Sequence, residues 1–346
     1  MLIVMLMKNG MGYILTDFIN KYCDTYMEWS DVLYESCSLL RSLCIHDDLR
    51  KDMSCAYENG RFFIKQIGLA ASLMKLSSYF YNHPLLASTA LQAAKNLVTT
   101  EESVQIMTTH GAIDLIKSIL SYEDSPVVLS KAVIALMRNV CADDIRKDRI
   151  VAEGSLDLLI NVMSKDPYNK DGALMEHAVA CLAAITLRSP SNSQRIIKTG
   201  SAIDILAQTM RFHIDRSGLL RQGALTIRNI SARCPELRPI LLDAGFEDIL
   251  RNAGKMLDVV DEDYGALRDL GCEVHYVRIN PESGTIEPVY EQFGAKTKLQ
   301  FNPIYDDDDK VITERIQQEA RAPCAKNIKD DDDDEHIHVH SSDCSH

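Results

Sequence analysis

Glycine, proline and aromatic residues are scarce in this chain. The 346 residues include 16 glycines, 10 prolines and one tryptophan, and aromatic residues make up 6% of the total. Few helix-breaking residues and few aromatics argue against a β sandwich and favour helices that pack through aliphatic side chains. Because 46% of the residues are hydrophobic, the chain can bury a large core.

The cysteines form no recognisable framework. Ten are scattered along the chain without a C-x-x-C pair or zinc-finger spacing. Cys44, Cys141 and Cys181 fall inside apolar helical patterns, where a free cysteine behaves as a small buried hydrophobe. We therefore expect a reducing compartment, no metal site and no cofactor.

Membrane and nucleic-acid signals are also missing. The apolar start, Met1–Met7, is too short for a secretory core, and no window reaches the length of a transmembrane helix. The net charge of −13 leaves no excess of lysine and arginine to neutralise phosphates. These absences predict a cytoplasmic protein, with nuclear access open, that neither inserts into membranes nor binds nucleic acid.

Catalytic motifs are missing as well. The sequence has no glycine-rich phosphate loop, no H-E-x-x-H and no G-x-S-x-G. Five histidines are spread between residues 46 and 213 without a recognised partner pattern, and each is interpreted as a surface or satisfied core side chain: His46, His83, His110, His177 and His213. We predict no catalytic residues and no enzymatic activity.

What the sequence does contain is an internal repeat, marked by glycine. The intervals are 43, 43, 46 and 45 residues in the series Gly68, Gly111, Gly154, Gly200 and Gly245. Gly10 extends the series backwards by 58 residues, so that unit carries an insertion. A glycine at this position permits a sharp turn between two helices.

A second landmark recurs in phase with the glycines. Each unit contains an apolar helix that reaches a shared position 15 or 16 residues before the next glycine: Asn96, Asn139, Ile185 and Asn229. The local sequences agree, as in AKNL, MRNV and IRNI, and LRSLC at 40–44 echoes them. Within a unit, apolar residues recur at i, i+3, i+4 and i+7, which is typical of amphipathic helices.

Three helices in 40–47 residues is the armadillo or HEAT period. We therefore predict an all-α, right-handed α-solenoid over residues 1–275, with its third helices, such as 127–141, lining a concave groove. A closed helical bundle is the less favoured alternative.

The helices GALTIRN at 223–229 and GALRDLGCEV at 265–274 resemble the armadillo-repeat-containing protein 6 family over about residues 10–275. The resemblance implies an armadillo fold and a general scaffold role, without established enzymatic activity. The single Trp29 departs from importin-α-like receptors, which place a tryptophan beside each groove asparagine to bind basic signals.

Residues 276–346 differ from the repeats, because they combine sixteen acidic with eight basic side chains and lack helical periodicity. We expect a disordered acidic tail. Within it, Asn302, Pro303 and Tyr305 form an Asn-Pro-x-Tyr motif that favours strand addition to a phosphotyrosine-binding-type domain, although chance occurrence is the simpler interpretation. The alternating His336, His338 and His340 are interpreted as a solvated polar end rather than a metal site.

The asparagine ladder carries the functional prediction. Each ladder asparagine follows a cation, and the candidate groove residues are therefore Lys95, Asn96, Arg138, Asn139, Arg228 and Asn229. Such a surface favours extended client segments that contain acidic residues, with an apolar gap at Ala184-Ile185. The alternatives are that the asparagines bond backbone within the stack, that the acidic tail occupies the groove, or that the chain is a structural subunit of a larger complex.

Overall fold

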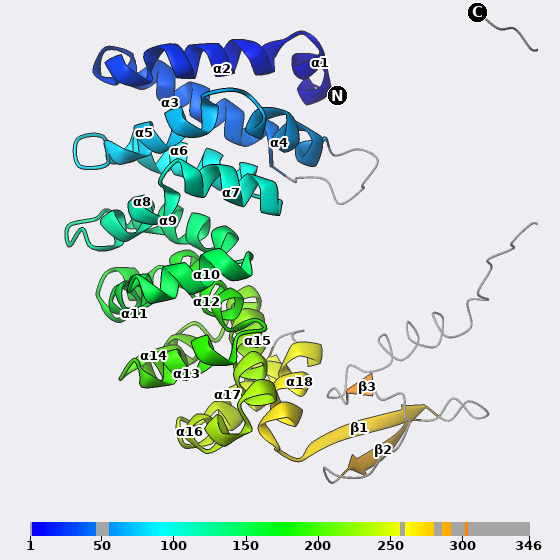
Figure 1. The fold of residues 1–346 in the computed structure, drawn as a ribbon. Helices are drawn as coiled ribbons and strands as arrows, with labels where there is room; N and C mark the ends of the chain where they lie inside the picture. Colours follow the sequence, from blue (N-terminus) through cyan, green and yellow to red (C-terminus); the bar gives the residue numbers. More distant parts are fainter. Residues whose placement is uncertain (1, 46–54, 257–259, 280–285, 292–301, 304–346) are drawn as a thin grey trace, which may run out of the picture.

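The computed structural model describes residues 2–45, 55–256, 260–279, 286–291 and 302–303. In this part of the chain, helices stack one unit upon the next, from α1 beside the N-terminus to α18 at the opposite end of the solenoid (Figure 1). Each unit contains three helices, as the glycine and asparagine periods predict.

The helices are grouped here by their place in the unit. The first helices are short: α1 (Leu2–Lys8), α4 (Ala56–Ile64), α7 (Glu101–Thr109), α10 (Asp144–Ala152), α13 (Pro190–Lys198) and α16 (Arg238–Asp243). The second helices follow the glycines: α2 (Met11–Tyr22), α5 (Leu69–Ser78), α8 (Ala112–Leu120), α11 (Ser155–Ser164), α14 (Ala202–Phe212) and α17 (Phe246–Met256). The third helices are α3 (Tyr26–Leu43), α6 (Pro84–Leu97), α9 (Val127–Val140), α12 (Gly172–Thr186), α15 (Ser217–Arg233) and α18 (Val260–Leu270).

The repeating glycines occupy the turn between the first and second helices. Gly111 and Gly154 have φ values of +89° and +87° and cap the N-termini of α8 and α11. A residue with a Cβ is strained at such angles, which explains why the repeat keeps glycine here. The positive φ also holds for Gly10, Gly68, Gly200 and Gly245.

The core runs the length of the stack, because every third helix packs on the next one. In α9 the side chains of Val133, Leu136, Met137 and Val140 have no exposed surface. A third helix lies between its own second helix and two neighbouring third helices, so most of its circumference is buried. This burial explains why these helices are more continuously apolar than a surface helix.

Three short strands follow the last helix. β1 (Val274–Ile279) pairs antiparallel with β2 (Ile286–Glu291), and the two-residue β3 (Asn302–Pro303) pairs antiparallel with the other edge of β1. The all-α class therefore applies to the repeats. Tyr305, both acidic runs and the alternating histidines lie outside the described residues.

Among the described residues, no single helix has the length and apolar character needed to cross a membrane. The pair Leu2–Lys8 and Met11–Leu43, bent by 70°, meets the length and composition criteria only when taken together.

Candidate protein-interaction groove

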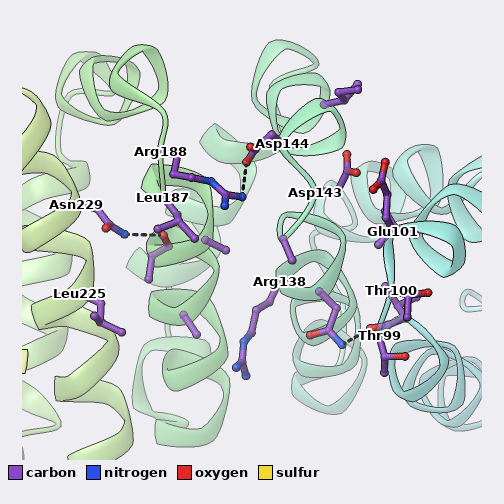
Figure 2. A pocket seen from close by; sticks show the side chains of 18 of the residues that line it. Thr99, Thr100, Glu101, Arg138, Asp143, Asp144, Leu187, Arg188, Leu225 and Asn229 are labelled. Atoms are coloured by element: carbon purple, nitrogen blue, oxygen red, sulfur yellow. Dashed lines mark hydrogen bonds and ion pairs between the residues drawn. The ribbon is translucent and has the colours of Figure 1, made fainter. Parts of the chain in front are cut away.

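A groove of about 850 Å³ crosses four consecutive units on the side formed by the third helices (Figure 2). Its floor comes from α9, α12 and α15, and one wall comes from the segments that lead into α7 and α10. Three of the six predicted groove residues line it: Arg138, Asn139 and Asn229. The other three lie outside this lining: Lys95 and Asn96 are on α6, and Arg228 is on α15.

Each ladder asparagine ties its helix to the preceding third helix. The Asn139 side-chain nitrogen donates to the carbonyl oxygens of Lys95 (2.9 Å) and Val98 (3.2 Å). Asn96 donates in the same way to the Arg41 carbonyl at 3.0 Å, and Asn229 donates to the Ala183 carbonyl at 3.1 Å. The amide nitrogens thus bond backbone within the stack, which leaves the Asn139 and Asn229 side-chain oxygens as the ladder's acceptors toward the groove.

The same bonding pattern corrects the position of the gap in the ladder. Each asparagine bonds the residue just before the equivalent position on the preceding helix, so the position equivalent to Asn229 on α12 is Ala184. Ile185 is completely buried and faces away from the groove. The apolar gap is real, but it is made by Ala180, Ala183 and Ala184.

The same rule applies to Asn96, which bonds the Arg41 carbonyl. Ser42 is therefore the α3 residue equivalent to the ladder asparagines, and Arg41 is equivalent to the cations that precede them. Arg41, Lys95 and Arg138 therefore occupy equivalent positions on α3, α6 and α9. None of the three pairs with a carboxylate of the described residues: Arg41 donates to the Gln92 side chain, Lys95 to the Asn96 side chain at 3.1 Å, and Arg138 has no hydrogen-bond partner there. Figure 2 shows Arg138 reaching away from the wall carboxylates of the groove.

These cations crowd one another. Burial, followed by the positive charges of Arg138 and Arg41, lowers the pKa of the Lys95 ammonium. We name Arg41, Lys95 and Arg138 the cation row.

Further along the stack, the cations are neutralised by the chain itself. Arg228 on α15 pairs with Asp269 on α18 at 3.3 Å. The neighbouring pairs follow the same rule, with Arg221–Glu262 at 3.1 Å and Arg216–Glu176 at 3.9 Å. Arg228 is therefore paired within the stack, in contrast to the members of the cation row.

His177 on α12 adjoins the cation row. Burial, followed by the charges of Arg138, Lys95 and Lys131, lowers its pKa to about 4, so the imidazole is neutral at physiological pH. Its Nδ1 atom is buried and has no hydrogen-bond partner among the described residues. No sequence pattern indicates this placement, because the other units carry no histidine at the equivalent position.

The groove wall carries acidic side chains, in contrast to the cation row. Glu101, Asp143 and Asp144 line it near the starts of α7 and α10. Asp144 binds the Lys147 ammonium at 2.6 Å and the Arg188 guanidinium at 3.2 Å. The same ammonium donates to the Leu187 carbonyl at 2.5 Å and so joins α10 to the end of α12.

Metal binding has no support in the described part of the chain, where no cluster of three or more histidine, cysteine, aspartate or glutamate side chains has suitable geometry.

Solved structures with the same arrangement of helices are armadillo repeat proteins. A designed armadillo repeat protein, YIII(Dq)4CqI, matches 68% of this chain and 92% of its own at a TM-score of 0.57 and 20% identity. A second, solved in complex with the peptide (KR)4, matches 74% of this chain and 99% of its own at a TM-score of 0.58 and 16% identity. The fold is an armadillo-repeat solenoid.

Curated relatives point to one kind of armadillo protein, although no protein-family model matches the chain. Armadillo repeat-containing protein 6 from Pongo abelii and from Homo sapiens are both 27% identical to it, over 197 and 199 residues. Each match covers 55% of this chain and 38% of the relative. The Drosophila melanogaster homolog is 27% identical over 166 residues, which is 48% of this chain and 35% of the relative.

Proposed function

We propose that the chain is a protein-interaction scaffold that binds extended client segments containing acidic residues along its third helices. Armadillo-repeat folds in general serve as protein-binding scaffolds, because the stacked units create a long continuous surface. The observation that carries the finer proposal is the cation row, whose three side chains pair with no carboxylate of the described residues.

The groove chemistry supports an extended segment. The Asn139 and Asn229 side-chain oxygens can accept from a client backbone, and the alanines between them leave room for an apolar side chain. A client carboxylate near Arg138 or Lys95 would form charge-assisted hydrogen bonds there. One designed relative in fold is solved with the basic peptide (KR)4, whereas the charges of the cation row favour the opposite sign.

Reversing two charges of the cation row tests this proposal. We expect Lys95→Glu with Arg138→Glu to weaken client binding at least about tenfold, because acidic segments would then meet like charges. The matched control is Lys117→Glu with Lys165→Glu, which changes the net charge equally at exposed positions on α8 and just after α11. Affinity capture followed by quantitative mass spectrometry measures how much client protein each variant binds relative to wild type.

An unchanged client set in the Lys95/Arg138 variant contradicts the proposal. A structural subunit of a large complex is the second candidate, and a short acidic peptide in excess separates the two. The peptide should displace clients held by the groove, while a subunit embedded through large surfaces should remain assembled.

Enzymatic activity is a distant third possibility, since armadillo repeat proteins are generally non-enzymatic scaffolds.

We also propose that the Asn-Pro-x-Tyr motif is a second, weaker interaction site. Asn302–Pro303 already lies in an extended strand paired with β1, which is the conformation that strand addition requires. Because β1 occupies one edge of this strand, a domain that adds at that edge must displace β1. For this mode of addition, an isolated peptide spanning 298–308 should bind a phosphotyrosine-binding-type domain more tightly than the full chain does. Titration calorimetry measures both, and Tyr305→Ala should abolish binding of either one. Equal affinity of peptide and chain would contradict the competition.

A further inference from the structure

We propose that Lys95, Arg138 and His177, with Arg41 beside them, form a binding site for a phosphorylated side chain of a client. This inference rests on the proposed groove function and specifies its ligand. The core of the site lies on α6, α9 and α12, and Arg41 on α3 lies next to Lys95, so a phosphoresidue would lie against three consecutive third helices.

The groups are brought together by the repeat itself. The Asn96 and Asn139 hydrogen bonds place Arg41, Lys95 and Arg138 at equivalent positions on adjacent helices. His177 on the next helix is close enough to feel the charges of both Lys95 and Arg138. The acid whose charge acts on His177 is Asp171, and the Lys131 ammonium already lies 3.5 Å from its carboxylate.

Two nitrogen atoms of the cluster lack hydrogen-bond partners among the described residues. Nε of Arg41 and Nδ1 of His177 are both buried without a hydrogen-bond partner. Buried polar atoms are usually paired, and like charges held close together weaken one another's protonated forms. An anion against the accessible guanidinium and ammonium groups offsets the repulsion between the like charges.

The number of donors favours a phosphate over a carboxylate. A carboxylate carries one negative charge, whereas a phosphomonoester carries nearly two at neutral pH and presents three acceptor oxygens. Two arginines and a lysine supply the donors that phosphate recognition uses. A protonated His177 would add one more, because the neighbouring dianion favours the imidazolium form.

The experiment uses the full chain and three degenerate libraries of short labelled peptides, each with a fixed central phosphoserine, glutamate or serine. We expect fluorescence anisotropy to give affinities in the order phosphoserine, glutamate, serine, with phosphoserine at least about tenfold tighter than glutamate. Arg138→Gln should remove most of this preference. Lys117→Gln, which removes one exposed charge from α8, should preserve it.

The outcomes separate this inference from the proposed function. If the phosphoserine and glutamate libraries bind equally and both lose binding in Arg138→Gln, the phosphate site is overturned. The proposal that the groove binds acidic client segments then still stands. Binding that is indifferent to Arg138→Gln in every library overturns both. Arg138 is exposed and has no hydrogen-bond partner in the described residues, so its replacement should not unfold the protein, and thermal unfolding checks this.

His177 provides an independent readout. Binding of a phosphoserine peptide selected from the library should raise the His177 pKa from about 4 by at least about one unit, measured by NMR of the imidazole. The groups whose charges already act on it are Lys95, Lys131, Arg138 and Asp171. An unchanged His177 titration in the complex would remove this residue from the site.

Discussion

Replacing Asp263 with asparagine should stabilise the protein at neutral pH and remove a steep loss of stability with rising pH. The Asp263 side chain on α18 is 1% exposed, and neither carboxylate oxygen has a hydrogen-bond partner among the described residues. Burial, followed by the charge of Glu262, raises its pKa to about 8, while Arg221 acts in the opposite direction. The native protein therefore holds a proton at neutral pH that the unfolded chain releases near its ordinary pKa of 3.8.

The proton held by the folded protein sets the direction in which stability changes with pH. Stability from the protonated group is fully present below about pH 4 and is lost as the pH rises toward 8, by about 1.4 kcal/mol per pH unit. Asparagine has nearly the same shape and does not titrate. Between pH 5 and 7, the unfolding free energy of Asp263→Asn should gain about 3 kcal/mol relative to wild type.

Urea unfolding at several pH values measures the effect, and Asp248→Asn, an exposed carboxyl on α17, is the control that should leave the wild-type profile unchanged. A constant difference between Asp263→Asn and wild type across this range would show that Asp263 is already ionised in the folded protein.

The repeat was predictable because its signals are local. A glycine at positive φ and an apolar period of 3.6 are properties of a few neighbouring residues, so the turns at Gly111 and Gly154 and the helices around them follow from the sequence. The ladder position on α12 was misplaced by one residue, because that unit has 16 rather than 15 residues between the ladder and its glycine. The extra length is absorbed after α12, where Arg188 adopts a φ of +58°.

The charges of the groove were only half predictable. The cations at Lys95 and Arg138 could be read from the repeat, whereas Arg41 was not among the candidates and was placed beside them by the Asn96 hydrogen bond. Pairing depends on residues far apart in the chain: Asp269, 41 residues from Arg228, neutralises that arginine, and no local pattern reveals it. The strands after residue 273 were missed because each is short and lies in an acidic region that lacks periodicity.

Lys147 provides the last prediction, because its buried side chain joins the first helix of one unit to the end of the third helix of the same unit. The residue is 1% exposed, and its ammonium bonds Asp144 and the Leu187 carbonyl. Lys147→Ala removes both bonds and leaves a cavity where the buried stem lay. We expect it to lower the unfolding free energy by about 3 kcal/mol, in the range of other large-to-small core substitutions.

A volume-conserving change separates packing from charge. Lys147→Met keeps the buried stem and loses only the ammonium, while the half-exposed Asp144 can be solvated, so it should cost about 1 kcal/mol. Lys170→Ala, which breaks the exposed pair with Asp166, should change stability by less than about 0.5 kcal/mol. If Met costs as much as Ala in urea unfolding, the ammonium rather than the filled volume holds the two helices together. Faster hydrogen exchange at the end of α12 in Lys147→Ala would connect that loss to Leu187 and Arg188, which line the groove.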